Sequence, residues 1–106
     1  MAPIEDQHAL ALEIGDLAQQ EDEDSEVLLC LYMPLVSTSS TSVIEMLAGD
    51  TSFLVREALA VHMAARPNSD LEHVAAKLAE DSYPQVSRPG KKALSAIRRM
   101  KYGSDA

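Results

Sequence analysis

Hydrophobic residues recur along most of this chain at the three-to-four-residue spacing of helices that bury one face. The clearest case is the segment 70–81, where the apolar positions follow i, i+3, i+4, i+7 and i+8: Leu71, Val74, Ala75, Leu78 and Ala79. Segments 4–19 and 50–66 show the same spacing less regularly. The pattern therefore predicts amphipathic helices in all three segments.

Residues 27–36 are apolar almost throughout, so periodicity alone does not separate a buried strand from a buried helix. The Leu, Cys and Met content, the acidic residues before the run and Pro34 near its end favour a helix, with Asp24 or Ser25 as its N-cap. The Ser/Thr segment 37–42 predicts a loop. A short helix at 43–48 is expected to follow it, ending at Gly49.

Prolines and a glycine mark the remaining helix ends. The helix at 50–66 is expected to begin with Asp50 or Thr51 as its cap and to end before Pro67. The last helix is expected to begin near Pro89, because proline suits the first helical position, and to end at Gly103.

Length and composition fit one domain over residues 1–106. The chain has 106 residues and is 46% hydrophobic but only 4% aromatic, so its core is aliphatic and suits helices. We expect an all-α fold, a compact bundle of about five to six short helices. Its expected parts are an N-terminal helix (1–20), an acidic loop (21–26), core helices (27–66) and a C-terminal helix pair (67–103). No internal repeat of 20–50 residues is apparent.

The single cysteine and the first residues bear on the compartment. Cys30 lies inside an apolar run, which predicts a small buried hydrophobe, and one cysteine excludes an internal disulfide. The chain begins with acids at Glu5 and Asp6, unlike a signal peptide. Its longest apolar run is about half of a membrane span. These features predict a cytoplasmic protein without membrane contact.

Catalytic and cofactor motifs are missing from the sequence. The histidines, His8, His62 and His73, stand at no metal-ligand spacing with each other or with Cys30. The pair Gly90-Lys91 lacks the other residues of a phosphate-binding loop, and no nucleophile elbow or dinucleotide turn occurs. We expect a protein that is not an enzyme and takes no cofactor, metal or small-molecule substrate.

Charge is divided along the chain. Residues 1–84 hold sixteen acids and three bases, whereas residues 85–106 hold six bases and one acid, and the total is −8. At about 100° per residue, Arg88, Lys92, Ser95 and Arg99 fall on one face of the last helix, roughly opposite its apolar residues. This arrangement predicts a basic surface, although bases late in a helix also favour its negative end and could pair with the acidic body.

The first functional hypothesis is a small DNA-binding transcriptional regulator that acts as a dimer. The last three helices loosely resemble a helix-turn-helix or winged-helix arrangement, in which the final helix reads bases. The binding residues would be Arg88, Lys91, Lys92, Ser95 and Arg99. The link from Asp81 to Arg88 is longer than the common tight turn, and no wing strands follow.

The second hypothesis is an acidic protein-interaction module, such as an adaptor, an antitoxin-like neutraliser or an inhibitor of a basic or nucleic-acid-binding partner. Acidic surfaces associate quickly with basic partners. The expected contact residues are Glu21, Asp22, Glu23, Asp24 and Glu26. The simpler interpretation of this acidic run is a solvated loop that leads into a helix.

Overall fold

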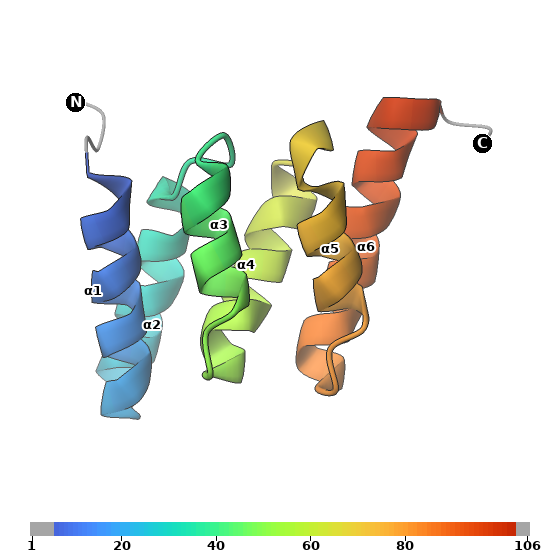
Figure 1. The fold of residues 1–106 in the computed structure, drawn as a ribbon. Helices are drawn as coiled ribbons and strands as arrows, with labels where there is room; N and C mark the ends of the chain where they lie inside the picture. The colour runs from blue at the N-terminus through green and yellow to red at the C-terminus, as the bar shows by residue number, and fades with distance from the viewer. Residues whose placement is uncertain (1–5, 104–106) are drawn as a thin grey trace.

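Helices account for most of the described part of the chain, residues 6–103 of the computed structural model, and no strand occurs there. The all-α prediction is confirmed. Six α-helices run alternately up and down (Figure 1). They are α1 (Gln7–Gln20), α2 (Glu23–Tyr32), α3 (Thr41–Ala48), α4 (Phe53–Ala65), α5 (Glu72–Ala79) and α6 (Pro84–Tyr102), with 3-10 turns at Met33–Leu35 and Ser69–Leu71.

The helices form three antiparallel hairpins that stand side by side. Helices α1, α3 and α5 form one layer and α2, α4 and α6 the other (Figure 1), and neighbours within each layer are in contact. The described residues measure 42 × 34 × 19 Å, so the array is broad and only two helices thick. The hairpin α1–α2 lies at one end and α5–α6 at the other.

Equivalent buried positions recur from hairpin to hairpin, 30 and then 31 residues apart. The first helices of the hairpins bury Ile14, Ile44 and Ala75, and then Leu17, Leu47 and Leu78. The second helices bury Ser25, Val55 and Val86, and then Leu29, Leu59 and Gly90. The same positions are buried in each hairpin, but they hold different residue types, so no repeat was apparent in the sequence. The fold is a stack of helical hairpins, the arrangement by which repeat proteins extend a core in one direction.

The loop prediction for residues 21–26 is wrong beyond Asp22. Helix α2 begins at Glu23, and the Asp22 carboxylate caps it by accepting the Ser25 backbone N–H at 2.7 Å, a role we had expected of Asp24 or Ser25. Three acids, Glu23, Asp24 and Glu26, then occupy the first turn. Carboxylates are stabilised at the positive end of the helix dipole, so the acidic run forms a helix start. The helical interpretation of the apolar run that follows is confirmed to Tyr32.

The last helix begins five residues earlier than expected. Pro84 is its first residue, Tyr83 before it is extended, and Pro89 lies inside the helix. The cost is the single backbone bond that the Pro89 nitrogen would have donated to the Gln85 carbonyl. The link from α5 is therefore only residues 80–83. Helices α5 and α6 lie antiparallel (Figure 1), whereas helix-turn-helix pairs cross at about 90–120°, so the resemblance does not extend to this crossing.

Candidate functional site

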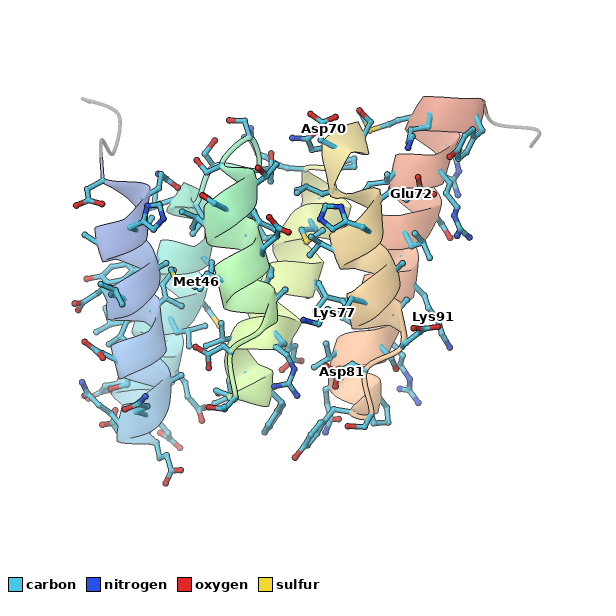
Figure 2. All side chains as sticks on the ribbon, in the orientation of Figure 1. Met46, Asp70, Glu72, Lys77, Asp81 and Lys91 are labelled. Carbon is cyan, nitrogen blue, oxygen red and sulfur yellow. The ribbon has the colours of Figure 1, made fainter. Side chains whose placement is uncertain are left out.

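The bases of α6 are divided between solvent and the body of the protein. The helix buries Val86, Gly90, Ala93 and Ile97. The opposite side carries what we call the basic face, which consists of Arg88, Lys91, Lys92, Ser95 and Arg99, all of them exposed. Lys91 lies at its margin, at the outer edge of α6 in Figure 2. The helical-wheel prediction thus matches the side of α6 that the fold leaves open.

The two remaining bases of α6 are neutralised within the chain. Glu72 accepts from Lys101 Nζ at 2.7 Å and from Arg98 Nε at 3.3 Å, and Tyr102 donates to the same carboxylate at 3.2 Å. Hydrogen bonding from Lys101 is the main reason that the pKa of Glu72 lies below its ordinary value. Among residues 6–103, no carboxylate pairs with the bases of the basic face.

A shallow hollow follows the basic face. Its volume is about 410 Å³, and it is lined by Lys91, Lys92, Ser95, Ala96 and Arg99. Three cations that have no carboxylate partner among residues 6–103 therefore line one concave strip. Such a strip can accept phosphates or carboxylates, since both bind lysine and arginine through charge-assisted hydrogen bonds.

The five acidic residues predicted to bind a partner are exposed, but they do not form one continuous surface. Glu21 follows α1 in the left-handed conformation, and Asp22 is engaged as the cap of α2. The bond from the Ser25 N–H holds the pKa of Asp22 below its ordinary value. Glu23, Asp24 and Glu26 point outward from successive directions around the first turn of α2. Of the five, only Glu26 lines the larger hollow described next.

A groove of about 580 Å³ lies between α2 and α4. Its neighbour in the same layer, the α4–α6 contact, is closely packed along its length. Most of the lining is apolar. The lining residues of this α2–α4 groove are Glu26, Leu29, Cys30, Met33, Pro34, Leu54, Glu57, Ala58, Val61, His62, Ala65 and Arg66.

Charges stand at the two ends of the α2–α4 groove. Helices α2 and α4 run in the same direction (Figure 1), so their first turns lie at the same end. Glu26 and Glu57 come from this end, and Arg66 follows the last turn of α4 at the other. The groove is therefore apolar in its middle, negative at one end and positive at the other.

Two groove residues differ from expectation. Cys30 was expected to be buried but is exposed, because its side of α2 faces the gap and not the core. His62 is buried, and its Nε2 lies 2.7 Å from the Val36 carbonyl oxygen, so this ring ties α4 to the segment after α2. The sequence did not predict the groove, because an apolar run does not show which of its residues pack against another helix and which stay exposed.

Within residues 6–103, no cluster of three or more His, Cys, Asp or Glu side chains could hold a metal ion, and none of the helices is long and apolar enough to cross a membrane. No family model, curated protein or solved structure matches the chain.

Proposed function

We propose that this protein is an interaction module whose α2–α4 groove binds the apolar face of a helix from a partner protein. The observation that supports the proposal is an open, mostly apolar groove between the neighbouring helices α2 and α4. Amphipathic helices bind such grooves through apolar residues at i, i+3, i+4 and i+7.

The polar lining favours a helix over a small molecule. Small-molecule sites place a few convergent polar groups within an apolar lining. Here Glu26 and Glu57 stand at one end and Arg66 at the other, while the His62 ring nitrogen is engaged with Val36. The partner helix that fits has an apolar stripe, bases at the end beside the glutamates and an acid beside Arg66.

A cysteine in the groove, Cys30, allows a site-specific crosslinking test. Cys30 is the only cysteine, is exposed and lines the groove, so a thiol-linked photocrosslinker attached there reports on this site alone. We expect illumination in cell extract to give an adduct whose crosslinked peptide is an amphipathic helix with the charge order described above. A synthetic copy of that peptide should bind the unlabelled protein in a calorimetric titration.

The matched variants use exposed positions. Val61→Lys places a charge in the apolar lining and should weaken binding of the peptide at least about tenfold. Thr51→Cys in a Cys30→Ala background moves the crosslinker to an exposed site outside the groove and should not give the adduct. If Val61→Lys leaves the affinity unchanged, or the adduct peptide has no apolar stripe, the proposal fails.

Binding of duplex DNA by the basic face stays a prediction from the sequence. Its support is the open strip of unpaired bases on α6. Two features weigh against it as the main function. The net charge of −8 repels DNA at long range, and α5 and α6 lie antiparallel instead of crossing as a helix-turn-helix pair does.

A further inference from the structure

The two ends of the stack carry opposite charge. The first hairpin, residues 7–35, contains seven acids and no lysine or arginine, whereas the last hairpin, residues 72–102, contains seven bases and three acids. Two of those three acids are already engaged, Glu72 by Arg98 and Lys101, and Asp81 by Arg56. The hairpins occupy opposite ends of the array (Figure 1), so the molecule has a negative end and a positive end.

The negative end also exposes apolar surface. Leu28, Leu31 and Leu35, which we call the leucine face, are 38%, 61% and 42% exposed. At about 100° per residue, Leu28 and Leu31 lie opposite Glu26 and Cys30, which line the groove. The leucine face therefore points away from α4, toward the open end of the stack. Asp24, four residues before Leu28, lies on the same side of the helix.

The leucine face lies at positions that face a preceding hairpin elsewhere in the stack, since Leu28 and Leu31 correspond to Ala58 and Val61 of α4, which line the groove toward α2. Each hairpin inside a stack buries its outer faces against the hairpins before and after it, and terminal hairpins of repeat proteins need a polar outer face to remain soluble. On the last hairpin the outer side is polar at Lys91, which is exposed although the corresponding Ala60 of α4 is fully buried. The first hairpin presents the leucine face instead, so apolar surface is left for a further hairpin to cover.

We propose that the occupant is a second copy of this chain, joined head to tail. The leucine face and acids of the first hairpin of one copy dock on the basic face of the last hairpin of the next copy. The hydrocarbon stems of Lys92 and Arg99 cover the leucines, while their charged ends meet carboxylates such as Asp24.

Charge selects this arrangement over a two-fold dimer. A two-fold interface brings the same patch of both copies together. At the negative end it would bring together two hairpins that each carry seven acids, and at the positive end two exposed basic faces. Like charges placed opposite each other are strongly unfavourable at an interface. Head-to-tail contact is the arrangement that joins opposite charges, and it leaves the α2–α4 groove uncovered.

Sedimentation velocity over a concentration series tests the proposal with exposed positions only. The unaltered protein should associate as its concentration rises into the millimolar range. A tail variant, Lys92→Glu with Arg99→Glu, should weaken association at least about tenfold, as should a head variant, Asp24→Lys with Leu31→Lys. An equimolar mixture of the two should associate again, because each brings one intact surface.

A control with a charge reversal at an exposed position outside both end hairpins, Arg66→Glu, should associate like the unaltered protein. Association of the tail variant alone at the unaltered strength would show a two-fold contact between negative ends and overturn the proposal. So would an unaltered protein that stays monomeric throughout. If that monomer retains duplex DNA and the tail variant does not, the basic face is a nucleic-acid surface instead.

Discussion

At the scale of single residues, one partly buried ion pair joins the second hairpin to the third. Arg56 Nε donates to Asp81 Oδ2 at 2.7 Å, with both side chains less than 15% exposed, and its Nη1 donates to the Asp50 carbonyl at 2.8 Å. The guanidinium also lies 5.6 Å from the Tyr83 ring centroid, and that ring stacks on Phe53 at 5.0 Å. These contacts fix the turn between α5 and α6 against the start of α4.

The Arg56–Asp81 pair should make stability depend on pH. Hydrogen bonding from Arg56 holds the pKa of Asp81 below its ordinary value of 3.8, so the stabilisation is present at neutral pH and is lost as pH falls through the lowered pKa. Asp81→Asn should reduce the free energy of unfolding by about 2 kcal/mol at neutral pH. Urea unfolding at several pH values should show the deficit shrinking in acid.

The control for this prediction is Asp16→Asn, which changes an exposed acid without an ion pair and should have little effect. A deficit of the same size at neutral and strongly acidic pH would mean that Asp81 acts through packing and not through its charge.

At the scale of elements, the approach of α5 to α6 depends on one glycine. A Cβ on Gly90 would lie 2.6 Å from the Leu78 carbonyl carbon and 2.7 Å from the Ala79 nitrogen. Both are backbone atoms, so the two helices would have to separate. Gly90 lies inside α6, six residues after its first residue, Pro84.

Alanine substitutions at two glycines should distinguish the effect of this close contact on stability from the effect of helix propensity. Gly90→Ala should lower the free energy of unfolding by about 1–3 kcal/mol, because backbone cannot rotate away as a side chain can. Gly15→Ala, in α1, should raise it by up to about 1 kcal/mol, because a Cβ there meets only Asp50 Oδ2 at 3.5 Å. Thermal unfolding of both variants checks the opposite signs, and a stabilised Gly90→Ala protein would refute the close-contact argument.

Helix existence was predictable from the sequence, but helix ends were not. Pro84 and Pro89 both carry the start signal, and local chemistry does not choose between them. Tertiary contacts select Pro84 as the start of α6. The Tyr83 ring before it stacks on Phe53, and Gly90 after it packs against α5. The acidic segment 21–26 is similar, since its charges suit a solvated loop and a helix start equally well until Asp22 caps α2.

At the scale of the whole molecule, packing is uneven along the stack. Helix α6 packs closely on both α4 and α5, whereas α2 meets α4 across the groove and shares far fewer contacts with it. Regions with few buried contacts open locally at lower free energy than densely packed ones. The hairpin that carries the leucine face and one wall of the groove is thus the less stable end.

Hydrogen exchange should show this gradient. Backbone amides in the middle of α2 should exchange at least about tenfold faster than those in the middle of α6, measured by mass spectrometry under native conditions. Equal protection of the two helices would mean that the stack opens as one cooperative unit, and the groove wall would then be as rigid as the rest.

The order of residues by itself determined the helical class, the approximate helix positions and the side of α6 that carries Arg88, Lys92, Ser95 and Arg99, because each follows from spacing within one helix. Tertiary structure alone decided that Cys30 lines an open groove and that Arg98 and Lys101 form ion pairs with Glu72. It also decided that the acidic and basic hairpins lie at opposite ends of the stack. These depend on which helix becomes the neighbour of which, and no local pattern carries that information.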